Sequence, residues 1–216
     1  MLTRELTSRL RTGLVLIILL LLPMLYSQTF CLNVLRIGIG LGAVEFALAF
    51  PSRVVGASLA VAWAAPSLVF LQTFMDDFGR FTMLDLLWVV LVYSDSLQLL
   101  AGKRFGATKM SLSVSPNKTL EGYVIGLALA LVLGCGVHRW PVVPMAVALI
   151  GGVLGDLAFS AAKRAAGVKD FSRVLGAHGG ICDRIDSYIG ACHALFWFGR
   201  AFPVHVRQAV VESRAL

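Results

Sequence analysis

One stretch of this chain, from Gly155 to Asp186, reads GDLAFSAAKRAAGVKDFSRVLGAHGGICDRID and concentrates charge in a sequence otherwise rich in Leu, Val, Ala, Ile and Phe. Its ionisable side chains include Asp156, Lys163, Arg164, Lys169, Asp170, Arg173, His178, Asp183, Arg184 and Asp186. A membrane chain retains such charge where the groups pair or serve a site. Acidic and basic residues alternate around the flexible pair Gly179-Gly180, which predicts a site that holds metal ions and phosphates together.

The composition around this stretch is that of an integral membrane protein. The 216 residues are 58% hydrophobic and 14% charged, and the mean hydropathy is +0.82; both lie outside the usual range of soluble globular domains. We therefore predict an all-α, polytopic membrane protein with one membrane-embedded domain over residues 1–216 and no separate soluble domain. The four cysteines form no CxxC pair, which argues against a metal–thiolate centre.

Seven apolar segments are candidates for transmembrane helices. They cover residues 14–26, 31–50, 54–74, 83–101, 121–137, 141–159 and 187–202. The first follows a basic N-terminus as in a signal peptide, but no convincing small-residue cleavage site follows it, so we expect it to be retained. The last is short and carries His193 and Arg200, so it either spans a thinned bilayer or lies partly in the interface.

The basic residues predict the orientation. Most of the 19 Lys and Arg residues fall in the N-terminal segment, at Arg53 and in two polar loops, at about 102–120 and about 160–186. The positive-inside rule then places the N-terminus and both loops in the cytoplasm. Because the net charge of +7 is interleaved with apolar and acidic residues, we expect anionic lipid head groups and phosphorylated substrates as partners, and no nucleic acid.

The first polar loop carries a pattern suited to phosphate. Ser115, Lys118 and Thr119 belong to SPNKTLEG, a hydroxyl-rich turn with one ammonium group that leads into a helix N-terminus. The same turn also suits simple helix capping. The preceding helix holds Asp95 near its cytoplasmic end, a few residues before this loop.

Glu45 is a second carboxyl group inside a predicted span. An ionised group there needs a partner or a wet cavity. A structural pairing with Arg36 or with another helix competes with a catalytic role for this residue.

The spacing within the charged stretch favours one face of a helix. Asp156, Ser160, Lys163 and Arg164 recur at i, i+4, i+7 and i+8, so they share a face if the sixth helix continues beyond the apolar run. A solvated amphipathic face is the alternative. Asp183 and Asp186, at i and i+3, are expected to point the same way, and their hard oxygen atoms suit magnesium or manganese.

From Ser160 to Asp186 the sequence resembles the signature of the phosphatidate cytidylyltransferases, also called CDP-diacylglycerol synthases. Upstream, Asp95, Gly102, Gly106 and SPNKTLEG look like further motifs of that family, and LTSRLRTGLVL looks like its basic start. The resemblance covers most of the chain, most densely from about 95 to 190.

The chain also departs from the family pattern. Phe159 stands where the family usually has Glu, Gly176-Ala177-His178 replaces the start of PGHGG, and Asn117 and Leu120 replace Lys and Trp. None of these changes removes a candidate metal ligand. Phe159 leaves an altered substrate preference or a reduced activity open.

The resemblance implies transfer of CMP from CTP to phosphatidic acid, giving CDP-diacylglycerol and pyrophosphate, at the cytoplasmic face of a bacterial-type inner membrane. It implies Mg²⁺, or Mn²⁺, as cofactor, and it is compatible with an added monovalent cation and with a homodimer. The implied metal ligands are Asp156, Asp183, Asp186 and Asp95. The implied catalytic residues are Asp156, Lys163, Arg164, Asp183, Arg184 and Asp186. The implied substrate-binding residues are Ser115, Lys118, Thr119, Ser160, Lys169, His178, Gly179 and Gly180.

The sequence leaves three alternatives open. The first is a related CTP-dependent enzyme acting on another lipid, such as a CDP-archaeol synthase or a polyisoprenol kinase. The second is an ion-coupled transporter, motivated by Glu45, Asp95 and Asp156 in or near spans. The third is a non-catalytic relative that binds phospholipid, which Phe159 makes conceivable.

Overall fold

The computed structural model describes residues 27–109, 118–176 and 179–201, apart from the side chains of residues 28, 75–83 and 88. The chain order is α3 (Gln28–Ala49), α4 (Arg53–Leu87), η2 (Trp88–Ser94), α5 (Asp95–Phe105), α6 (Leu120–Gly136), α7 (Val142–Ala165) and α8 (Cys182–Ala201). Across the described residues the one β-type pairing is an isolated bridge between Lys109 and Thr119. The predicted all-α class is confirmed for this part of the chain.

The predicted number of spans is too high for the described residues. Four helical segments are long and apolar enough to cross a bilayer: Thr29–Ala49, Arg53–Phe74, Leu84–Phe105 and Val142–Ala165. Helix α6 is apolar but has only 17 residues, and α8 carries charged and polar side chains at both ends. The predicted span at 14–26 lies outside the described residues. The described residues therefore belong to a polytopic membrane protein with four candidate spans, where six were predicted.

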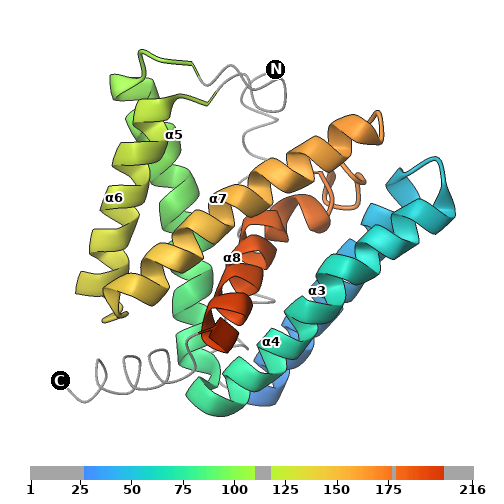
Figure 1. Ribbon diagram of the computed structural model, residues 1–216, viewed down its shortest axis with the longest axis horizontal. Coiled ribbons are helices and arrows are strands. Elements are labelled where there is room, and N and C mark those ends of the chain that lie inside the picture. Colours follow the sequence, from blue (N-terminus) through green and yellow to red (C-terminus); the bar gives the residue numbers. More distant parts are fainter. Residues whose placement is uncertain (1–26, 110–117, 177–178, 202–216) are drawn as a thin grey trace.

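The helical path is continuous from α4 through η2 into α5. The chain nevertheless reverses direction between the apolar segments Arg53–Phe74 and Leu84–Phe105 (Figure 1). This reversal falls between the predicted apolar segments 54–74 and 83–101. The π-helical η2 ends directly before Asp95, and such wide turns often accompany functional sites because they shift the register of the residues that follow.

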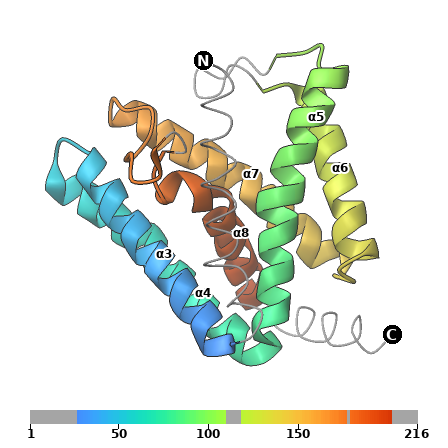
Figure 2. The same ribbon diagram turned by 180° about the vertical axis from the view of Figure 1, so that it is seen from behind.

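The two predicted polar loops lie at the same end of the helices. Both views place the end of α5 and the start of α6 at the end where α7 gives way to the loop before α8 (Figures 1 and 2). Helix α7 continues to Ala165, beyond the predicted apolar run, and ends at Gly167 with a φ of +72°. The described parts of the two loops therefore lie at one end of the helices, while the side of the membrane that they face stays a prediction; Asp156, Ser160, Lys163 and Arg164 are all helical.

Helices α7 and α8 pack with their backbones in close contact. A Cβ atom added at Gly155 would lie 2.6 Å from the carbonyl oxygen of Asp186 and 2.7 Å from the Cα of Gly190. Small residues at such crossings let two helices approach closely in a membrane. This contact brings the start of α8, with its two aspartates, beside Asp156.

A Gly155→Ala substitution is expected to lower the melting temperature of the purified protein, because the methyl group has no space and overpacking costs about 1–3 kcal/mol. The matched control is Gly38→Ala in α3, where an added Cβ meets nothing within 4 Å. Alanine favours a helix by about 1 kcal/mol over glycine, so the control should melt at the same or a higher temperature. Equal melting temperatures for the two variants would contradict the close crossing.

Candidate active site

Two lysine–aspartate pairs mark the polar end of the helices, and each lysine also lies over an aromatic ring. Lys163 pairs with Asp183 at 2.8 Å, and its ammonium lies 5.5 Å from the centre of the Phe171 ring. Lys118 pairs with Asp156 and lies 5.2 Å from the centre of the Tyr123 ring. Charge pairing and the negative face of a ring both hold a cation in place.

Asp183 organises the loop that leads into α8. Its Oδ1 faces Lys163, while its Oδ2 accepts the backbone N–H of Phe171 at 3.0 Å and of Gly180 at 2.9 Å. The Asp183 side chain is only 4% exposed and that of Lys163 only 13%. Three of the roughly four acceptor positions of the carboxylate are therefore already used by the protein.

The carboxylates of Asp183 and Glu45 lie so close to the backbone at Gly179 and Gly180 that a side chain at either position would crowd them. Gly179 has a φ of +79°, a region that residues with a side chain rarely adopt. A Cβ atom at Gly180 would lie 2.5 Å from Oε2 of Glu45 and 2.7 Å from Oγ of Ser172. In the described structure, the groups that approach these two glycines closely are therefore protein side chains.

Glu45 is a structural anchor for this loop. The buried carboxylate accepts the hydroxyl of Ser172 at 2.7 Å and the backbone N–H of Cys182 at 2.9 Å. Arg36 instead donates to Gln72. The expected pairing with Arg36 is therefore wrong, and the expected pairing with another helix is confirmed at the first residue of α8.

A Glu45→Ala variant is expected to lose activity by about 10-fold or more, since the loop loses two hydrogen bonds of about 1.5–3 kcal/mol each. Glu45→Gln should retain most activity, because its amide oxygen can accept from Cys182 while its NH₂ group donates to the Ser172 hydroxyl. Initial rates and melting temperatures of both variants check this. Equal losses in the two variants would show that the negative charge, not the hydrogen bonding, matters.

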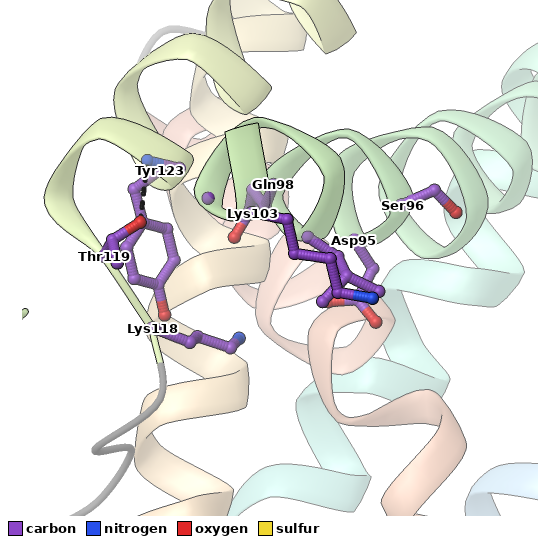
Figure 3. Close-up of a pocket in the computed structure, with 10 residues that line it drawn as sticks. Asp95, Ser96, Gln98, Lys103, Lys118, Thr119 and Tyr123 are labelled. Carbon is purple, nitrogen blue, oxygen red and sulfur yellow. Dashed lines mark hydrogen bonds between the residues drawn. The ribbon is translucent and has the colours of Figure 1, made fainter. Parts of the chain in front are cut away.

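Lys118 stands at the wall of a pocket of about 470 Å³ between α5 and α6 (Figure 3). Thr119 caps α6 by accepting the N–H of Gly122 at 3.2 Å, as the capping alternative predicted. The Glu121 carboxylate accepts the N–H of Thr108 at 3.0 Å and so ties the end of the α5 loop to the start of α6. These contacts fix the position of the backbone on either side of α6's first residues, next to Lys118. The pocket is lined by Asp95, Ser96, Gln98, Leu99, Gly102, Lys103, Lys118, Thr119, Gly122 and Tyr123.

The Lys118 ammonium is strongly stabilised in its charged form. Burial alone would lower its pKa, but the charge and the hydrogen bond of Asp156 outweigh burial and raise the pKa above its ordinary value. Lys118 is thus a permanent cation at neutral pH. A smaller hollow, lined by residues that include Asp95, Lys118, Asp156 and Ser187, connects this pair with the start of α8.

The four expected metal ligands are not gathered into one shell. Among the described residues no three His, Cys, Asp or Glu side chains are placed to hold a metal ion. Asp156 and Asp183 are each neutralised by a lysine. Asp186 is buried, and burial, followed by the charge of Asp156, raises its pKa to about 7. The charge of Asp95 makes a smaller contribution to this shift.

Comparison with known proteins identifies the family. Residues 3–202 match the cytidylyltransferase family. The chain belongs to that family. A phosphatidate cytidylyltransferase of Helicobacter pylori is 42% identical over 134 residues, which is 56% of this chain and 49% of the relative. One from Brucella abortus is 36% identical over 135 residues, 59% of this chain and 50% of the relative.

The similarity extends to a plant relative. Phosphatidate cytidylyltransferase 4, chloroplastic, of Arabidopsis thaliana is 37% identical over 107 residues, which cover 45% of this chain and 27% of the relative. The aligned part of this cytidylyltransferase-family chain spans about half the length of the bacterial relatives described above, and less of the plant protein.

The remaining predicted site residues of this cytidylyltransferase-family chain are spread over the same end. Arg164, Lys169 and Arg184 are exposed, and Ser160 is half-buried on α7. Ser115 and His178 lie outside the described residues, so their predicted roles stay predictions.

Phe159, the main departure from the family pattern, lies in the core. It is 6% exposed, and its ring centre lies 5.6 Å from Phe46, 5.3 Å from Trp63 and 6.1 Å from Phe171. These four rings join α3, α4 and α7 to the loop that Asp183 organises. In this cytidylyltransferase-family member, Phe159 therefore packs in the aromatic core beneath the loop that precedes α8.

Sequence reasoning missed several residues that the fold brings to the site. Gln98, Lys103 and Tyr123 line the pocket, and Gln98 donates to Ser94 at 2.6 Å. The available signal was their spacing: Gln98 follows Asp95 by three residues and Tyr123 follows Lys118 by five. These three residues line the same pocket only because α5 packs against α6.

Proposed function

We propose that this protein is a phosphatidate cytidylyltransferase, which transfers CMP from CTP to phosphatidic acid and releases pyrophosphate. The observation that carries the proposal is the family match over residues 3–202. Relatives that carry this name in bacteria and a plant support it. The apolar helices fit a substrate whose acyl chains stay in the bilayer.

The proposed reaction depends more on positive charge that stabilises the phosphates than on a general base. An oxygen of the lipid phosphate attacks the α-phosphorus of CTP, the bond from that phosphorus to the bridging oxygen breaks, and pyrophosphate leaves. A phosphate monoester has a second pKa of about 6, so the nucleophile is already largely ionised near neutral pH. The main barrier is repulsion between two anions, which fixed cations reduce.

Lys118 and Lys163 supply such cations in the proposed reaction. Each is held by an aspartate and an aromatic ring at the polar end of the helices. Lys103 on the same pocket wall, and the exposed Arg164, Lys169 and Arg184 near α7 and α8, would add positive charge for the phosphates of CTP. Asp183 keeps the loop before α8 in place.

Magnesium remains part of the proposal through the acidic group of Asp95, Asp156 and Asp186. Their oxygen atoms suit a hard divalent cation, and binding would require these side chains to move closer together, because among the described residues no three such groups are placed to hold a metal ion. When bound, the cation would neutralise phosphate charge. Asp183 fits this role less well, because three protein donors already occupy its carboxylate.

The test is an assay of the purified protein with magnesium and with CTP labelled either on the cytidine or on the γ-phosphate, in separate reactions that offer phosphatidic acid, a polyisoprenol or an ether-lipid phosphate as the acceptor. Cytidylyl transfer puts only the cytidine label into the lipid and releases pyrophosphate. Entry of the γ-label into a polyisoprenol would instead indicate a lipid kinase, and transfer only to an ether-lipid phosphate would indicate the archaeal-type reaction. Absence of all three would contradict the proposed enzyme class.

A further inference from the structure

Tyr123 carries a buried hydroxyl group that has no role in the reaction as described above. The side chain, on the first turns of α6, is 6% exposed and lines the pocket between α5 and α6. Its Oη atom is inaccessible to solvent and has no hydrogen-bond partner among the described residues. Buried tyrosine hydroxyls usually find a partner because an unpaired one costs free energy. An exception inside a pocket indicates that the partner is a ligand.

The neighbouring lysine cannot accept the proton of this hydroxyl. Figure 3 shows the hydroxyl end of Tyr123 directed toward the Lys118 side chain. The Lys118 ammonium lies over the ring and makes its ion pair with Asp156. An ammonium group has only donors, so it offers no acceptor to the O–H of Tyr123. The hydroxyl proton therefore requires an acceptor, and the adjacent cation favours an anionic one.

We propose that Tyr123 donates a hydrogen bond to a phosphate oxygen of the bound substrate, which Lys118 contacts at the same time. The inference rests on the proposed function and extends it with a specific phosphate-binding pair. Because the Lys118 stem is flexible and partly exposed, a shift of its ammonium from Asp156 toward the ligand gives the phosphate access to the hydroxyl. The phosphate belongs either to CTP or to phosphatidic acid.

A Tyr123→Phe variant tests the pair, because it removes the hydroxyl and keeps the ring. The control is Tyr93→Phe, since Tyr93 packs against His138 and does not line the pocket. For wild type and both variants, the dissociation constants of CTP and of a short-chain phosphatidic acid are measured separately in magnesium-containing detergent buffer. The melting temperature of each ligand-free protein is measured in parallel.

The expected result is an affinity about 10-fold or more lower for one of the two ligands in Tyr123→Phe, as for loss of a hydrogen bond to a charged group. The ligand identifies the source of the phosphate. The ligand-free variant should melt at the same or a higher temperature, because an unpaired hydroxyl has been removed. The control should keep both affinities.

Two outcomes would overturn the inference. One is unchanged affinity for both ligands, and the other is a lower melting temperature of ligand-free Tyr123→Phe, which would reveal a structural partner. Failure of the proposed function looks different. In that case wild type forms no CDP-diacylglycerol in the transfer assay, whatever the binding data show for the variant.

Discussion

An Asp183→Asn variant is expected to be less stable by about 3–5 kcal/mol, the cost of breaking a buried ion pair from one side, and to lose most cytidylyl transfer because the loop before α8 is no longer held in place. Oδ1 of Asp183 faces the Lys163 ammonium, and Oδ2 faces two backbone N–H groups. Either orientation of the asparagine amide therefore sets an NH₂ group against a donor. The substitution also leaves Lys163 without a counter-charge in a site where it is only 13% exposed.

The same variant separates a loop-organising role from a purely metal-binding one. Loss of the loop contacts should lower the melting temperature in metal-free buffer, whereas loss of a metal ligand alone would leave that temperature unchanged or raise it. The matched control is Asp170→Asn, since Asp170 is exposed in the same loop and should keep both activity and stability. Near-normal transfer by Asp183→Asn would refute the assignment.

A Lys118→Met variant is expected to reduce kcat/KM by about 10²-fold, comparable to removal of one electrostatic donor from a reacting centre. Methionine keeps an unbranched stem but removes the cation that lies over the Tyr123 ring. The control is Lys109→Met, because Lys109 is exposed on the same connection and does not line the pocket. Steady-state rates with varied CTP and varied phosphatidic acid provide the measurement.

The pH dependence gives a second readout for Lys118. Its pKa is raised above the ordinary lysine value, so the stability from the pair with Asp156 is fully present below about pH 10.4 and is lost only as the pH rises through the higher folded pKa. The activity profile of wild type should therefore show no Lys118-dependent limb between about pH 6 and 9. A limb in that range that disappears in Lys118→Met would contradict the paired, protonated lysine.

The helices could be read from the sequence because their signals are local. The apolar runs 31–50, 54–74 and 83–101 agree closely with Thr29–Ala49, Arg53–Phe74 and Leu84–Phe105. For the described residues, the predicted count of six spans was too high because hydrophobicity alone does not tell a short apolar helix such as α6 from a full span. The spacing from Asp156 to Arg164 correctly predicted a continued helix, since i, i+4 and i+7 is a helical period.

The partners of the charged side chains could not be predicted in the same way. Asp183 and Asp186 do lie on one helix, yet Asp183 turns to the loop and Lys163 while Asp186 is buried near Asp156. Glu45 reaches a loop about 130 residues further along the chain. Phe159, the departure that leaves an altered substrate preference or a reduced activity open, packs among three other aromatic rings. Such pairings depend on distances between segments, which no local pattern contains.

The charged stretch from Gly155 to Asp186 by itself determined the class of protein, the helical periods and the residue types available for phosphate and cation chemistry. The tertiary structure decided which of these groups meet. The glycine contact between α7 and α8 sets Asp156 beside the start of α8, and the packing of α5 and α6 sets Lys118 and Tyr123 on one pocket wall. Charge interactions fall off with distance and burial, so the properties of these side chains follow from the packing and not from the spacing alone.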